Sequence, residues 1–228
     1  MRTVSRGHHI RALAAEFLGT ALLLAGVVGS GIMAQRLSQG NDAVALLANA
    51  LATGFLLPVL ILLFAPHSGA HFNPVVSLAE ALSKRLHART LAAYAVIQTA
   101  GAIAGVWLAH AMFAEPLLQT STRVRTGGAQ WLAECVATFG LLLIILQRRR
   151  FPAHALPWMI GAYIAAAYWF TASTSFANPA VTLARALTDT FAGIRPADAL
   201  AFIAAQLVGA LAALGASRFF GDDAPTPD

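Results

Sequence analysis

Two Asn-Pro steps, Asn73-Pro74 and Asn178-Pro179, are the residues whose types and spacing point most directly to a chemistry. Asparagine is a preferred helix cap and proline suits the first helical turn, so each step predicts the start of a short helix. The two predicted helices cover residues 74–83 and 179–188. A helix start leaves backbone N–H groups unpaired and carries about half of a positive elementary charge. Two such starts facing each other would repel cations, while the asparagine amides donate hydrogen bonds to a neutral solute.

Two carboxylates, Glu16 and Glu134, lie inside long apolar stretches and are 118 positions apart. They occupy matching places in A-E-F-L-G-T (15–20) and A-E-C-V-A-T (133–138). An acid within a membrane is costly, and one hypothesis is a proton relay or ion site of a coupled secondary transporter. Their paired positions favour a second hypothesis, in which each carboxylate orients the exposed backbone of a pore loop.

The remaining polar side chains offer little for catalysis. His71 precedes Asn73 by two residues and is expected to line a pore or brace its loop, and no second ligand stands at helical spacing from it. His67 is either a pH-sensitive group or an ordinary interfacial residue. The sequence holds no nucleophile triad, glycine-rich phosphate loop or Cys/His cluster. We therefore expect no enzyme, no metal and no cofactor.

The elements that must position these residues are long apolar runs. The chain of 228 residues is 58% hydrophobic and 11% charged, with a mean hydropathy of +0.68, whereas a soluble domain carries about twice that charged share. Six runs are long enough to cross a bilayer, and they cover residues 11–34, 43–65, 89–110, 129–147, 153–172 and 197–217. The net charge is +5, and the basic residues lie beside these runs without forming a single patch. This distribution indicates membrane orientation rather than nucleic-acid binding.

The chain repeats itself. The two Asn-Pro steps are 105 positions apart, and Q-T-A-G-A at 98–102 matches Q-L-V-G-A at 206–210. Three spans and one half-helix make an odd number of crossings, so the second half enters from the opposite side, as an inverted repeat. We therefore expect an all-α membrane protein with six transmembrane helices and two re-entrant half-helices. The predicted organisation is an N-terminal segment (1–10), a first repeat (11–110), an outer loop (111–128), a second repeat (129–218) and a tail (219–228).

Orientation follows from the distribution of basic residues. With the N-terminus inside, ten lie on the inner side: Arg2, Arg6, Arg11, Lys84, Arg85, Arg89, Arg148, Arg149, Arg150 and Arg218. Four lie on the outer side: Arg36, Arg123, Arg125 and Arg195. This asymmetry predicts a multi-pass protein of a bacterial-type inner (plasma) membrane with both termini in the cytoplasm.

The motifs resemble those of the aquaporin and aquaglyceroporin (major intrinsic protein) family. S-G-A-H-F-N-P-V-V at 68–76 and N-P-A-V at 178–181 are similar to its two signature loops, and A-E-F-L-G-T is similar to its first helix. The resemblance implies a homotetramer with one pore per subunit. It implies that the pore loops 68–72 and 173–177, which include His71 and Phe176, expose carbonyl oxygens to the solute.

Two positions depart from the family pattern. Val75 takes the place of an alanine in the first motif, which also differs from the second, Asn178-Pro179-Ala180. Val181 stands where the family usually has the arginine of the outer constriction. The resemblance gives Thr53 and Ser175 as partners in this filter, and either Tyr168 or Ala166 as the fifth-span residue. Thr53, Ser175 and Val181 make a small, uncharged ring.

The missing arginine predicts a wide filter and bulky neutral solutes. Valine at this position resembles the bacterial aquaglyceroporins associated with arsenic-resistance genes. The expected solutes are arsenous acid and other metalloid hydroxides, glycerol-type polyols and water, with a water-selective channel as the alternative. Arg185 follows Val181 by one helical turn. It is a candidate for positive charge in the outer vestibule; otherwise it snorkels to the interface or satisfies the end of the half-helix.

Overall fold

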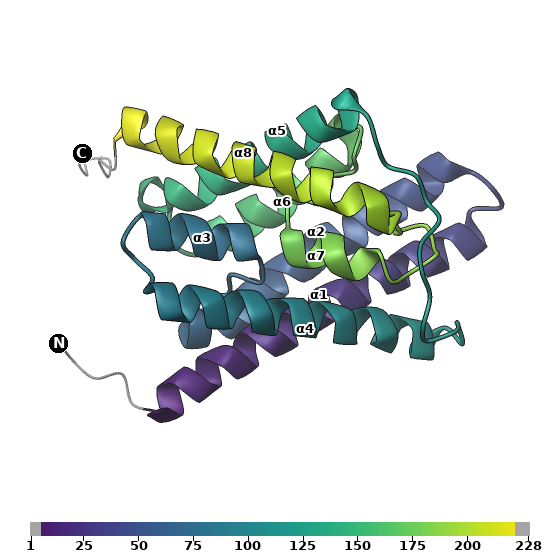
Figure 1. Cartoon of the computed structure of the whole chain (residues 1–228), viewed down its shortest axis with the longest axis horizontal. Coiled ribbons are helices and arrows are strands. Elements are labelled where there is room, and N and C mark those ends of the chain that lie inside the picture. Colours follow the sequence, from purple (N-terminus) through teal and green to yellow (C-terminus); the bar gives the residue numbers. More distant parts are fainter. Residues whose placement is uncertain (1–5, 222–228) are drawn as a thin grey trace.

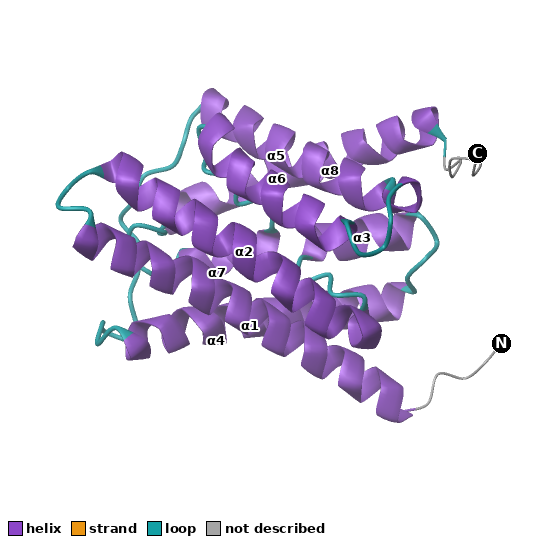
Figure 2. Cartoon of the chain, turned by 180° about the vertical axis from the view of Figure 1, so that it is seen from behind, coloured by secondary structure: helices purple, strands orange, loops and turns teal. Residues whose placement is uncertain are grey.

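The computed structural model describes residues 6–221, and this part of the chain contains helices, turns and loops without a strand (Figure 2). Six long helices are α1 (Arg6–Leu37), α2 (Asp42–Ser68), α4 (Ala88–Met112), α5 (Gly128–Leu146), α6 (Leu156–Phe170) and α8 (Pro196–Phe220). The short elements are α3 (Pro74–Leu82), α7 (Pro179–Arg185) and one 3-10 turn, η1 (Arg148–Arg150). The expected all-α fold of six long helices and two half-helices is confirmed.

The six long helices run along the long axis of the molecule, and α3 and α7 lead from its middle toward opposite ends (Figure 1). Helix α1 begins and α8 ends at the same end, which we call the terminal face. The opposite end, the loop face, is formed by segments 38–41, 113–127 and 186–195.

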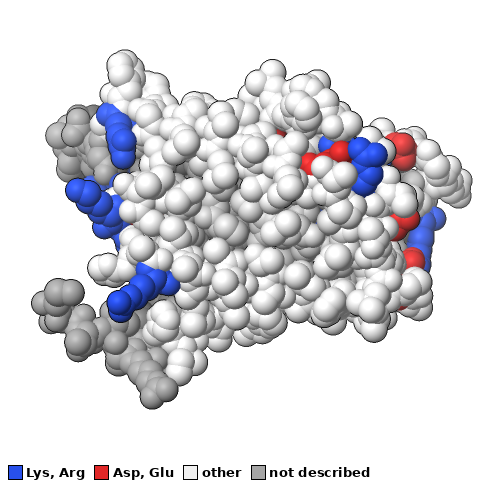
Figure 3. All heavy atoms as spheres, in the orientation of Figure 1, with Lys and Arg blue, Asp and Glu red and all other residues white. Residues whose placement is uncertain are grey.

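Five of the long helices are long and apolar enough to cross a membrane, and α6 is a shorter apolar helix. On the face shown in Figure 3, charged side chains lie toward the two ends of the molecule, and the surface between them is uncharged. This distribution is that of a multi-pass membrane protein.

Two helices end earlier than the sequence predicts. The expected span 153–172 is α6 from Leu156 to Phe170, because the Thr171 hydroxyl and N–H both donate to the carbonyl of Ala167 and close the last turn. The expected half-helix 179–188 ends at Arg185. The carbonyl of Arg185 accepts a hydrogen bond from the Ile194 N–H of the returning loop, so the helical ladder stops there.

Glycines allow close helix contacts at equivalent places of the two halves. A Cβ on Gly101 of α4 would lie 2.5 Å from the carbonyl oxygen of Phe17 in α1. A Cβ on Gly209 of α8 would lie 2.3 Å from the carbonyl oxygen of Cys135 in α5. Small residues at such contacts are how membrane helices approach closely. These two helix pairs hold α3 and α7 in the interior.

Candidate pore and its filter

The two asparagines cap the half-helices from equivalent positions. The Asn73 Oδ1 accepts from the N–H of Val75 at 3.0 Å. The Asn178 Oδ1 accepts from Ala180 at 3.0 Å and from Val181 at 3.3 Å. Pro74 and Pro179 occupy the first helical turn, where no N–H is needed. The capped helix starts therefore meet in the middle of the molecule.

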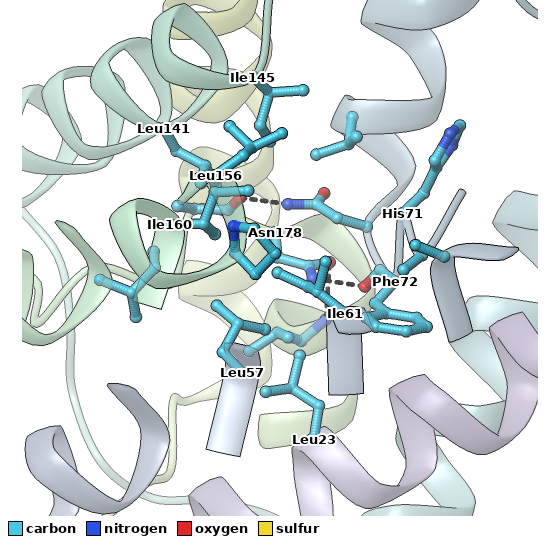
Figure 4. Close-up of a pocket in the computed structure, with 18 of the residues that line it drawn as sticks. Leu23, Leu57, Ile61, His71, Phe72, Leu141, Ile145, Leu156, Ile160 and Asn178 are labelled. Atoms are coloured by element: carbon cyan, nitrogen blue, oxygen red, sulfur yellow. Dashed lines mark hydrogen bonds between the residues drawn. The ribbon is translucent and has the colours of Figure 1, made fainter. Parts of the chain in front are cut away.

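The same asparagines connect the two halves. The Asn73 Nδ2 donates to the carbonyl of Ala177, and the Asn178 Nδ2 donates to the carbonyl of Phe72, each at 2.8 Å (Figure 4). A side-chain amide has two N–H groups. Both asparagines line the same cavity, so the second N–H of each side-chain amide can donate a hydrogen bond into it.

The loops that enter the half-helices have a strained backbone. Five non-glycine residues of these loops adopt the left-handed region at φ of 49 to 62°: Ala70, Phe72, Thr174, Ser175 and Ala177; the counterpart of Thr174 in the first loop is Gly69, also at positive φ. Such conformations persist only where the surroundings impose them, and they gather at functional sites. The strained residues again fall at matching positions, 105 apart.

Glu16 and Glu134 impose this backbone. Both are fully buried. Glu16 accepts hydrogen bonds from the N–H groups of His71 at 2.9 Å and Phe72 at 2.7 Å, and from the Ser68 hydroxyl at 2.6 Å. Glu134 accepts from the N–H groups of Phe176 at 2.8 Å and Ala177 at 2.9 Å. Every acceptor oxygen of the two carboxylates thus has a partner in a loop or a neighbouring helix.

Two glutamines complete the arrangement and are not among the predicted site residues. Gln98 Nε2 donates to Glu16 at 2.7 Å and to the Ser77 hydroxyl at 3.1 Å. Gln206 Nε2 donates to Glu134 at 2.6 Å and to the Thr182 hydroxyl at 2.9 Å. The signal was present in the sequence, because each glutamine opens one of the two matching Q-x-x-G-A stretches.

A cavity of about 570 Å³ runs along this centre, from Arg148 and Glu80 near the terminal face to Arg185. Much of its wall is aliphatic, and Figure 4 shows Leu23, Leu57, Ile61, Leu141, Ile145 and Ile160 around it. The polar part of the wall includes the two asparagines, residues of both loops, and side chains of the surrounding helices such as Thr53 and Tyr168. A solute in this cavity therefore meets a line of hydrogen-bonding groups along an otherwise apolar passage.

Four of the predicted filter residues line the same cavity: Thr53, Tyr168, Ser175 and Val181. The hydroxyls of Thr53 and Tyr168 are 3.3 Å apart. Ala166, the other fifth-span candidate, is exposed on the surface of α6. The buried Ser175 hydroxyl has no hydrogen-bond partner within residues 6–221. Val75 is buried in a cluster with α5 and α8, away from the cavity wall.

Arg185 is buried in the wall of the cavity, with 2% of its surface exposed, and does not snorkel. Its guanidinium stacks on Phe176, with Cζ 3.4 Å from the ring centre, and its Nε donates to the carbonyl of Ala192. Arg185 therefore adds a positive charge to the wall that also contains the uncharged residues Thr53, Ser175 and Val181 of the predicted filter.

Other residues support the loops. The Nδ1 of His71 and the Ser77 hydroxyl are 2.9 Å apart, whereas His67 lines a separate cavity at the terminal face. Arg125, not predicted as a site residue, donates to the carbonyls of Gly193 at 2.8 Å and Ser173 at 3.1 Å. Across residues 6–221, no three His, Cys, Asp or Glu side chains are placed to hold a metal.

The chain is similar to known proteins. The sequence profile of the major intrinsic protein family matches residues 3–175. The chain is 59% identical to the aquaglyceroporin AqpS of Rhizobium meliloti (strain 1021) over 92% of its own length and 89% of the relative's. It is 40% identical to aquaporin Z of Brucella melitensis over 40% of each chain. The solved aquaglyceroporin of Plasmodium falciparum superposes with a TM-score of 0.68 at 23% identity, covering 93% of this chain and 95% of the other.

Proposed function

Since the chain belongs to the major intrinsic protein family, whose members are membrane channels, we propose that it is an aquaglyceroporin-like channel with a wide filter. Neutral solutes would cross it down their own concentration gradients. The observation that carries the proposal is the lining of one cavity: Thr53, Tyr168, Ser175 and Val181 all line it together with both asparagines, and the residue directly after Ala180 is a valine.

The expected solutes are small, neutral and rich in hydroxyl groups. Glycerol-type polyols, arsenous acid and related metalloid hydroxides fit an apolar passage with a line of donors and acceptors, and water passes as well. The name of the Rhizobium relative, an aquaglyceroporin, supports this solute class. The two carboxylates would act by fixing the loops, because their oxygens are occupied by loop and glutamine donors.

We further propose a homotetramer in a bacterial inner membrane, with both termini in the cytoplasm and with inverted repeats at 11–110 and 129–218. The excess of basic residues on the terminal side supports this orientation. Exposed apolar side chains on the long helices supply surface for lipid and for neighbouring subunits.

The test is stopped-flow light scattering on proteoliposomes under sucrose, glycerol and arsenous acid gradients. The substitution Val181→Arg places a guanidinium in the constriction, which narrows it and adds a rigid set of donors. We expect glycerol and arsenous acid flux to fall by about tenfold or more, with water flux kept.

The matched control is Val181→Thr, which keeps the size of the side chain and should conduct glycerol like the wild type. Fast water flux without solute flux in the wild-type protein would instead make this a water-selective channel.

A further inference from the structure

The guanidinium of Arg185 has unused donors. Its Nε is bound to Ala192, and its two terminal nitrogens have no hydrogen-bond partner in the described part of the chain. The residue nevertheless lines the cavity, so these nitrogens have only the cavity contents to bind. Helix α7 runs toward the loop face, and Arg185 lies one turn, about 6 Å, beyond Val181.

The charges around Arg185 do not balance it. Arg123 repels its guanidinium, and Arg185 and Arg123 both repel that of Arg125. Tyr168 and Glu134 attract both Arg185 and Arg125. Glu134 is the one carboxylate among these groups, and it already accepts three hydrogen bonds. The Phe176 ring below Arg185 offers a favourable face without a net charge.

A buried charge that lacks a partner is strongly unfavourable, and proteins resolve this by pairing it. Ionisation of arginine is almost never lost, so neutralisation of the side chain is not the solution here. A mobile anion from the solvent at the loop face is the remaining partner. The planar fork of the guanidinium matches two oxygens of a carboxylate or phosphate group.

We propose that Arg185 forms a binding site for a small oxyanion in the loop-face half of the pore, and that the bound anion obstructs the flux of neutral solutes. The inference rests on the proposed channel function. An anion held there does not pass on, because the wall toward the terminal face is largely aliphatic, with Leu57, Ile61 and Leu141 among its residues. Leaving the guanidinium for that wall would cost the anion its charged partner, because the cavity lining, within the described residues, holds no other Lys or Arg before Arg148 at its far end.

Inorganic phosphate is a suitable test anion because it offers paired oxygens and crosses lipid slowly. Glycerol flux is measured in sealed right-side-out vesicles, with external sodium phosphate replacing sodium chloride at equal osmolarity and ionic strength. One bidentate, charge-assisted contact implies binding in the millimolar range, so about 20 mM phosphate should lower wild-type glycerol flux at least about twofold.

Three substitutions separate the site from general charge effects. Arg185→Gln removes the charge and should abolish the block, whereas Arg185→Lys keeps the charge without the fork and should retain part of it. Arg36→Gln is the matched control, because Arg36 lies exposed at the loop face, where it pairs with Glu115. Its phosphate sensitivity should equal that of the wild type.

If phosphate leaves the glycerol flux of the wild type unchanged, the inference is overturned. It is also overturned if phosphate blocks the wild type and Arg185→Gln equally. Entry of labelled phosphate at a rate close to that of glycerol would also overturn it, because the site would then conduct the anion. A wild-type protein without any glycerol flux is a different result, since it contradicts the proposed channel function itself.

Discussion

Val181 stands where the family usually has an arginine, and Arg185 carries a positive charge one turn further along the same half-helix. The two places are chemically different. A guanidinium in the constriction limits the size of every solute, while one beyond it leaves the constriction open and acts mainly on charge. In the proposed channel, selection by size and selection by charge would therefore be separated along the pore.

The role of the buried Glu134 carboxylate can be tested by substitution. Glu134→Gln replaces one acceptor oxygen by a donor that faces backbone N–H groups, leaving at least one buried donor unpaired. We expect a loss of stability of about 1–3 kcal/mol and a lower solute flux, measured by thermal unfolding in detergent and by light scattering.

The control for this substitution is Glu115→Gln, which alters a partly exposed ion pair with Arg36 and should change little. A Glu134→Gln protein of normal stability that lost an ion-dependent uptake would favour the secondary-transporter alternative.

The roles of single residues were predictable where the same residue type stands at matching positions of the two halves. Asn73 with Asn178, and Glu16 with Glu134, stand at matching positions, so each supports the other. Tyr168 could not be chosen over Ala166, because the length of the loop before Asn178 leaves the register open. Arg125 was missed for a physical reason, since its partners Gly193 and Ser173 are distant in sequence and contribute only backbone carbonyls.

At the scale of elements, the half-helices depend on close packing of the long ones. Gly209→Val would push a side chain into the backbone of α5, which a Cβ at this position would already meet at 2.3 Å from the carbonyl of Cys135. We expect a destabilisation of about 1–3 kcal/mol or more, seen as a lower unfolding temperature and a smaller yield of folded protein.

Gly215 on the same helix is the matched control. A Cβ there meets nothing within 4 Å, so Gly215→Ala should be neutral or stabilise the helix by up to about 1 kcal/mol. Equal effects of the two substitutions would contradict the packing argument.

The helices themselves were largely predictable from apolar length and the Asn-Pro starts. Their ends were less so, because α6 and α7 end through hydrogen bonds of Thr171 and Ile194 that follow from the folded loops. The short α7 matters, since it brings the loop of residues 186–195 back against Arg185.

For the whole molecule, the proposed orientation can be measured. In a Cys135→Ser background, a cysteine at the exposed Thr120 of the loop face should react with a membrane-impermeant thiol reagent on intact cells. A cysteine at the exposed His154 of the terminal face should react only after lysis. The reverse pattern would place both termini outside and would move the Arg185 site to the cytoplasmic mouth.

The crossed hydrogen bonds of Asn73 and Asn178 also bear on how the chain is made. The first pore loop leaves the ribosome about a hundred residues before the loop that completes it, and a lone polar loop in lipid is unfavourable. During synthesis, residues 69–73 must therefore wait in a hydrated or chaperoned setting until α5 and α6 have been inserted. We therefore expect the two loops to close on each other late, after insertion, so that substitutions at the crossing point would act on biogenesis as well as on the proposed conduction.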